Sequence, residues 1–363
     1  MATRIHFLDN LRTTIIFLVV LYHAGGVYES SGIWSAFWIV DDPLTNHISG
    51  MILLVLDLFM MPALFFISGY FTPSSIGRKR GKEFILNRAR RILLPWFIAV
   101  FTLIPLYRSI FLFSRNLPQE NWQLYFHLYH PNSQNWLWFL PVLFTFNMIF
   151  LLISKTDLSM PDISLKHTLF GMFALGFIYS FAMDLTGLRG WTLTPVIDFQ
   201  NERILIYFLF FLLGARCFHL KVFDTPPDPK KRYMAICLVS WIPISAYLFF
   251  LLFPFVFSPG NALFSKNMDR AIVWAGFHLS AFCLVYIMIE TFRRYVNTGG
   301  MVWTVLNRNS YSIYIIHVIL IGLGALLLLN LPIPSFLKHM ILAVSTFLTG
   351  NVLVSLCRKP WTQ

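Results

Sequence analysis

LDNLRTTIIFLVVLYHAGG, residues 8–26, indicates a membrane protein, because a polar start leads into an apolar run long enough to cross a membrane. Within it, Arg12 and His23 lie eleven residues apart, and the residues between them are almost wholly apolar. At a helical rise of about 1.5 Å per residue, the two are separated by about 16 Å, roughly half a bilayer core. We therefore expect a cation at one membrane surface and an imidazole near the midplane of the same helix.

Similar apolar runs recur along the whole chain. Of its 363 residues, 57% are hydrophobic and 12% are charged, about half the charged fraction of an ordinary soluble domain. This composition predicts one all-α polytopic membrane domain over residues 1–363 rather than several soluble domains. The ten transmembrane helices are expected at 13–31, 48–71, 91–113, 136–154, 167–184, 203–219, 233–257, 270–290, 309–329 and 338–357.

The distribution of charge sets the expected orientation. A net charge of +12 suits a nucleic-acid-binding protein, but with the N-terminus in the cytoplasm 21 of the 28 Lys and Arg residues fall in cytoplasmic tails and loops. We therefore expect both termini in the cytoplasm, a multi-pass protein of the cell inner membrane, contacts with membrane lipids and no nucleic-acid partner. The four cysteines form no metal-binding motif, so we expect no bound metal and no resident cofactor.

His23 is the first candidate catalytic residue. A histidine inside a membrane span can be a packing residue that hydrogen-bonds to a neighbouring helix. However, placing a polar side chain inside a membrane span costs free energy, roughly 2.5–3.5 kcal/mol for a charged one. A functional role for His23 is therefore the second interpretation. Since imidazole exchanges protons near neutral pH, His23 can act as a general base that takes the proton of an attacking hydroxyl.

Two further polar residues are predicted near the depth of His23. Asp57 lies in MILLVLDLFMMPALFF and, as a catalytic residue, would orient the imidazole; alternatively it pairs with another polar group near the outer surface. His317 lies in NRNSYSIYIIHVIL, with Tyr314 three residues earlier on the same helix face. His317 and Tyr314 are expected to line a polar, substrate-binding cavity, or to be packing residues.

A group of arginines is predicted at the inner mouth. Arg88 and Arg91 are three residues apart before the third span, and Arg12 enters the same membrane surface. Three converging guanidinium groups can bind the phosphates of a nucleotide-bearing donor such as a coenzyme A thioester. Alternatively, they mark topology and contact anionic lipids.

Two residues are candidates for substrate contact on weaker grounds. Ser68 in FFISGYF offers a hydroxyl at the inner end of the second span, although helix packing also explains this segment. Trp138 in NWLWFLPVL lies at the start of the fourth span, where it can stack on a sugar or belong to an interfacial aromatic belt.

Taken together, these segments resemble the acyltransferase-3 family of integral membrane acyltransferases. The resemblance lies in the order of six segments: LDNLR with an Arg-x10-His spacing, FFISGYF, RARR, NWLWFL, FFLLGAR and SYSIYIIH. It implies a ten-helix fold, a cytosolic acyl-CoA donor and acceptor hydroxyls on the outer face, with Arg12 and His23 as the functional pair and Arg88 and Arg91 on the donor side. HFLDNLR, VYESS and LFFISGYF are most similar to the subgroup that succinylates periplasmic glucans.

The chain departs from the family pattern in two respects. It shows no fused extracytoplasmic esterase-like domain, which is why the O-antigen acetylase subtype is not supported. Asp57 matches no family motif, so its role is predicted from depth alone. We therefore expect an O-acyltransferase that moves a succinyl or acetyl group from acyl-CoA to a hydroxyl of an extracytoplasmic glycan. The alternative is a carrier that moves acyl groups, glycans or lipids without forming bonds.

Overall fold

The fold is almost entirely helical. The computed structural model describes residues 5–32, 37–77, 81–125, 134–155 and 163–358. In chain order, the helices are α1 His6–Gly25, α2 His47–Asp57, α3 Met60–Gly77, α4 Gly81–Arg88, α5 Leu94–Ser114, α6 Trp122–Tyr125, α7 Phe139–Ile153, α8 Leu165–Leu185, α9 Ile204–His219, α10 Lys230–Val239, α11 Trp241–Leu252, α12 Lys266–Tyr295, α13 Met301–Leu328 and α14 Ser335–Arg358. Short 3₁₀ or π segments cover Ala89–Leu93, Asn135–Trp138, Val222–Asp224 and Phe253–Phe257.

One small antiparallel hairpin interrupts the helices. Its strands, β1 Trp191–Thr192 and β2 Phe199–Gln200, pair Trp191 with Gln200. Among the described residues, nine helical segments are long and apolar enough to cross a membrane, which confirms the prediction of a polytopic all-α membrane protein. The remaining expected span, 203–219, corresponds to α9, an apolar helix that is shorter than the other nine.

The first helix begins earlier than predicted. The expected span 13–31 is helix α1, which starts at His6 and ends at Gly25. Phe7, Leu8, Leu11 and Ile15 are all buried, so the apolar stripe of a helix already runs through the polar first turns. His23 therefore lies in the last turn of α1, toward its C-terminal end, and not midway along the helix as expected.

The second expected span, 48–71, is two helices, because α2 ends at Asp57 and α3 begins at Met60. Helix α3 packs closely on α9, and two glycines allow this contact. A Cβ atom at Gly69 would collide with the backbone carbonyl of Phe211, and one at Gly214 with that of Phe66. The glycines of FFISGYF and FFLLGAR therefore let two helix backbones touch.

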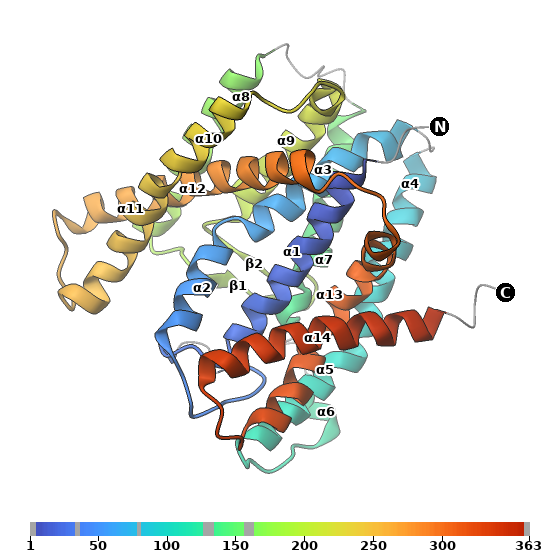
Figure 1. The fold of residues 1–363 in the computed structure, drawn as a ribbon, viewed down its shortest axis with the longest axis vertical. Coiled ribbons are helices and arrows are strands. Elements are labelled where there is room, and N and C mark those ends of the chain that lie inside the picture. Colours follow the sequence, from blue (N-terminus) through green and yellow to red (C-terminus); the bar gives the residue numbers. More distant parts are fainter. Residues whose placement is uncertain (1–4, 33–36, 78–80, 126–133, 156–162, 359–363) are drawn as a thin grey trace.

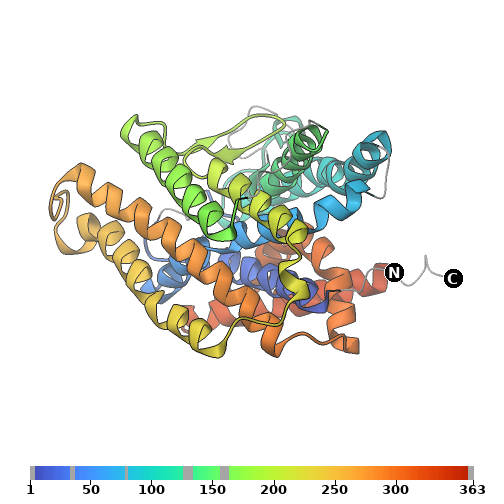
Figure 2. The ribbon, with the colours of Figure 1, turned by 90° about the horizontal axis from the view of Figure 1, so that it is seen from above.

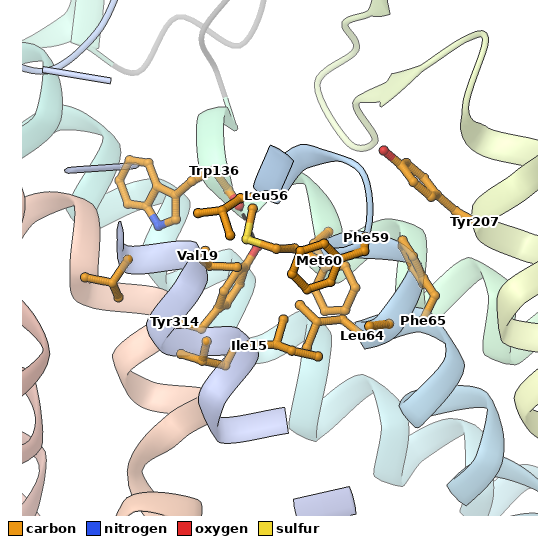
Figure 3. Close-up of a cluster of buried hydrophobic side chains, with 14 of the residues drawn as sticks. Ile15, Val19, Leu56, Phe59, Met60, Leu64, Phe65, Trp136, Tyr207 and Tyr314 are labelled. Carbon is orange, nitrogen blue, oxygen red and sulfur yellow. Dashed lines mark hydrogen bonds between the residues drawn. The ribbon is translucent and has the colours of Figure 1, made fainter. Parts of the chain in front are cut away.

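Helix α1 lies inside the molecule, packed against α2, α3, α12, α13 and α14 (Figure 1). The first turn of α1, helix α4 and the last turn of α14 lie on the same side of the molecule (Figures 1 and 2). Buried side chains from several helices fill the interior beside α1, among them Val19, Leu64 and Phe65 (Figure 3). This packing holds the C-terminal end of α1 in a fixed position against α13.

Candidate active site

Two histidines from opposite ends of the chain form the centre of the candidate site. The last turn of α1 places His23 beside His317, which lies in the middle of α13 and is fully buried. His317 Nε2 and His23 Nδ1 are 2.9 Å apart, and the ring centroids are 4.9 Å apart. The structure therefore joins two of the predicted site residues directly.

The hydrogen bonds of His317 define the tautomers of the neutral pair. His317 Nδ1 lies 2.6 Å from the Tyr314 carbonyl oxygen, which can only accept, so Nδ1 carries the proton. Nε2 of His317 is then an acceptor, and His23 Nδ1 donates to it. In a neutral His23 ring the other nitrogen, Nε2, has no proton and can take one from a substrate.

Aromatic rings surround the histidine pair. Trp38 stacks on the His23 ring with centroids 5.2 Å apart and 15° between the planes, and its Nε1 donates to the His23 carbonyl. Trp136 lies edge-on to His317 at 6.5 Å, and Tyr107 lies between the two tryptophans. These rings lower the local polarity, which strengthens electrostatic interactions at the pair.

Hydrogen bonds and a buried ion pair hold the loop that carries Trp38 against His23. Arg115 donates to the Trp38 carbonyl oxygen at 3.0 Å, and the Tyr107 hydroxyl donates to that of Phe37. Four residues after Trp38, Asp42 pairs with Lys338 of α14 at 2.9 Å, and both side chains are completely buried. Sequence reasoning missed Trp38 and this pair, because a tryptophan and an aspartate in a loop between two expected spans carry no signal of burial.

Asp57 is not joined to His23. As the last residue of α2, it points to the start of α9 and pairs with Arg203 at 2.5 Å. Of the two interpretations of Asp57, the structure therefore shows the pairing with another polar group, while His317 is the residue that bonds to His23. Asp57 ends α2, where its side chain meets the residue before α9, a contact between distant segments that hydropathy does not encode.

The predicted donor-side arginines lie near the ends of their helices. Arg12 forms an ion pair with Asp9 at 3.2 Å and its side chain is 38% exposed. The Arg88 guanidinium lies over the Phe84 ring, while Arg91 is exposed within the π-helical segment Ala89–Leu93. Arg88 ends α4 and the π segment that contains Arg91 follows directly, so the two arginines lie on either side of the junction between an α-helical and a π-helical turn.

Helix α13 contacts both the arginine segment and the histidine pair. The Tyr311 hydroxyl donates to the Arg91 carbonyl at 2.8 Å, and the Tyr314 hydroxyl donates to that of Trp136 at 2.5 Å. Tyr314 and His317 are three residues apart on the buried face of the helix. Tyr311 lies about 9 Å along the helix axis from His317 and about 120° around it, so α13 extends from the basic segment to the predicted base.

Ser68 and Trp138 lie elsewhere. Ser68 precedes Gly69 at the α3–α9 contact, and its carbonyl accepts a bond from the Thr72 hydroxyl. The Trp138 ring lies 5.3 Å from Trp191 and 6.0 Å from Tyr207. Within the described ranges, no contact joins either residue to the histidine pair, and Trp136 is the NWLWFL tryptophan beside His317.

Among the described residues, no group of three or more His, Cys, Asp and Glu side chains could hold a metal ion.

A family model described as an acyltransferase domain, that of the acyltransferase-3 family, matches residues 5–357. No curated protein and no solved structure matches the chain.

Proposed function

The chain belongs to the acyltransferase-3 family and is a multi-pass membrane acyltransferase, and we propose that it moves an acyl group from a cytosolic acyl-CoA to a hydroxyl of an extracytoplasmic glycan. The enzyme class is one that transfers groups other than amino-acyl groups. The further parts of the proposal are a succinyl or acetyl group, a glucan acceptor and a location in the cell inner membrane. They rest on the resemblance of the N-terminal segments and on the charge distribution.

The His23–His317 pair is the observation that carries the proposed mechanism. His23 Nε2 takes the proton of the acceptor hydroxyl, and the oxygen attacks the thioester carbonyl carbon. The carbon–sulfur bond breaks, and the coenzyme A thiolate takes the proton back from the His23 imidazolium. His317 stabilises the imidazolium by accepting the Nδ1 hydrogen bond, a role comparable to that of the third residue of a triad.

The basic segment supports a donor on the cytoplasmic side. With the N-terminus in the cytoplasm, Arg12, Arg88 and Arg91 are near that surface, and guanidinium groups bind phosphates well. Helix α13 contacts Arg91 through Tyr311 and His23 through His317, and these two residues are about 9 Å apart along the helix axis, a distance that the thioester arm can span. The phosphates would stay at the arginines while the reactive carbonyl reaches His23 from within the protein.

The test is acyl transfer by purified protein in detergent, with labelled succinyl-CoA or acetyl-CoA and a linear glucan. The native chain is expected to esterify the glucan, and His23→Ala to lower the rate about 100-fold or more. His219→Ala, an exposed histidine at the end of α9, is the matched control and keeps full activity.

Each other outcome rejects part of the proposal. Equal rates for the native chain and His23→Ala would remove His23 from the chemistry. Movement of label across sealed vesicles without an ester in detergent would indicate a carrier, since a carrier needs a closed membrane and an enzyme does not. Esterification of lipid instead of glucan would replace the acceptor.

A further inference from the structure

A second polar and aromatic cluster lies at the end of α2, outside the contacts of the histidine pair. Asp57 and Arg203 form its polar part. Tyr207, which follows Arg203 by one helical turn and feels both charges, connects this pair to an aromatic wall formed by Trp138 and Trp191. These residues come from α2, the start of α7, strand β1 and the start of α9. Tyr207 lies at the opposite edge of the buried cluster from Trp136 (Figure 3).

The ion pair leaves hydrogen-bonding capacity unused. Asp57 is 26% exposed at its side chain and Arg203 is 11% exposed. Arg203 Nη1 donates to Asp57, but the buried Arg203 Nε has no hydrogen-bond partner among the described residues. Since buried polar groups in native proteins are nearly always paired, an orphaned guanidinium N–H beside a partly open carboxylate points to a ligand that supplies the missing partner.

The wall is held rigidly and is open on one side. Gln134 Nε2, four residues before Trp138, donates to the Thr194 carbonyl at 2.9 Å and so ties the hairpin to the start of α7. Glu202 accepts from the Gly190 backbone N–H at 2.8 Å on the other side of the hairpin. Trp191 is 45% exposed although its ring packs on Trp138. The hairpin therefore presents a preformed aromatic surface.

The chemistry of this cluster favours neutral sugar rings. The charges of Asp57 and Arg203 compensate each other, which does not suit a phosphate or carboxylate ligand. A carboxylate that accepts and a guanidinium that donates can both bond to hydroxyl groups, while tryptophan rings offer flat apolar surface to the faces of a sugar. Tyr22, the neighbour of His23 on α1, lies within electrostatic range of Asp57 and Arg203.

We propose that Asp57, Arg203, Trp138 and Trp191 bind sugar units of the acceptor glycan at a distance from the reacting hydroxyl, an inference that rests on the proposed function. Asp57 is thereby a substrate-binding residue. Phe139, the residue after Trp138, contacts Tyr314, and Tyr314 contacts His317. Because the cluster and the histidine pair are this close, a long acceptor would occupy both and a short one only the second. The cluster thus gives the enzyme a preference for long glycan chains.

The experiment compares linear glucan oligosaccharides, from the disaccharide to the octasaccharide, as acceptors with a fixed labelled acyl-CoA. For the native chain, kcat/KM is expected to rise at least 10-fold from the shortest to the longest acceptor. Trp191→Ala and Asp57→Asn are expected to abolish this rise by increasing KM for the octasaccharide. Trp241→Ala, an exposed tryptophan on α11, is the matched control and should keep the rise.

The outcomes separate the two proposals. No transfer to any glucan by the native chain contradicts the proposed function itself. Transfer without a dependence on acceptor length, or a dependence that survives in both Trp191→Ala and Asp57→Asn, overturns the sugar-binding site and leaves the acyl transfer intact. Calorimetric titration of the octasaccharide without donor checks the result, since both variants should weaken binding about 10-fold.

Discussion

His23 and His317 are 294 positions apart in the chain, and their imidazole rings share a hydrogen bond of 2.9 Å. The Tyr314 carbonyl fixes the proton of His317 on Nδ1, so hydrogen bonds are donated in one direction, from His23 on α1 to His317 on α13 and on to the Tyr314 carbonyl. The neutral imidazole of His317 thereby accepts the Nδ1 hydrogen bond of the candidate base, which in many hydrolases is accepted by a carboxylate. This suits a site lined by tryptophans, because burying a carboxylate there would carry a large desolvation cost.

His317→Ala should lower kcat by about 100-fold while the KM values for donor and acceptor change little, because His317 orients His23 and does not hold substrate. His317→Gln should recover part of the rate, since its amide oxygen can accept the His23 Nδ1 hydrogen bond. Steady-state kinetics of the two variants measure the difference. Equal loss in both, or a change in KM alone, would contradict a positioning role.

Gly69→Ala should destabilise the protein strongly, because its Cβ would meet the Phe211 backbone, which cannot move aside as a flexible side chain would. Overpacking of this kind costs about 1–3 kcal/mol or more. Gly77→Ala, in the same helix but with nothing within 4 Å of the added Cβ, should be neutral or slightly stabilising. Thermal unfolding in detergent compares the two, and similar midpoints would argue against the close α3–α9 contact.

Lys338→Met should destabilise by about 3–5 kcal/mol, because it leaves the fully buried Asp42 carboxylate without its cation. The double variant Lys338→Met/Asp42→Asn should regain part of that loss, since the charge is removed and the bond from the Leu44 N–H to the side-chain oxygen can be kept. Lys230→Met, on the exposed start of α10, serves as the control. A double variant no more stable than Lys338→Met would show that the pair's charges do not interact strongly.

Arg88→Ala and Arg91→Ala should each raise the KM for acyl-CoA, by roughly 10-fold for the loss of a charge-assisted phosphate contact. The KM for the glycan acceptor should stay the same, because in the proposed mechanism the acceptor enters from the other side of the membrane. Lys231→Ala, an exposed cation on α10, controls for the general loss of basic charge. Unchanged donor kinetics in both arginine variants would assign these residues to topology or lipid contact.

Asp198 should make the stability of the β1–β2 hairpin depend on pH. Burial raises the pKa of this carboxyl to about 6, against the hydrogen bond from the Thr194 N–H, which lowers it. The folded state therefore holds the proton more tightly than the unfolded state, so stability is greatest below the unfolded pKa, falls as pH rises toward about 6, and stays lower above it. The change amounts to roughly 3 kcal/mol.

Asp198→Asn isolates this contribution, because asparagine keeps the oxygen that accepts from Gln134 and Thr194 but does not titrate. Thermal unfolding of the native chain and of Asp198→Asn is compared at pH 4 and pH 7. The variant should be the more stable protein at pH 7, and the two should be similar at pH 4. Parallel curves for both proteins would exclude a titrating Asp198 in this range.

Much of the architecture was predictable from hydropathy. Nine of the ten expected spans correspond to helical segments long enough to cross a membrane, and the tenth is α9. The boundaries of α1 were wrong, because the apolar stripe of Phe7, Leu8 and Leu11 is hidden among polar neighbours. The break after Asp57 was also missed, although Pro62 signals it: proline has no N–H for the carbonyl four residues earlier, that of Leu58, and its ring clashes with that carbonyl.

Apolar runs and the rare polar residues within them are local features, so the fold class, the candidate base and the basic segment could be predicted from the amino-acid sequence. The three-dimensional structure was needed to show that His23 bonds to His317, that Asp57 pairs with Arg203, and that Trp136 and Trp38 are the tryptophans beside the histidines. Partners of this kind depend on the rotation and axial position of helices far apart in the chain. Close packing of their side chains sets both quantities, and hydropathy does not encode them.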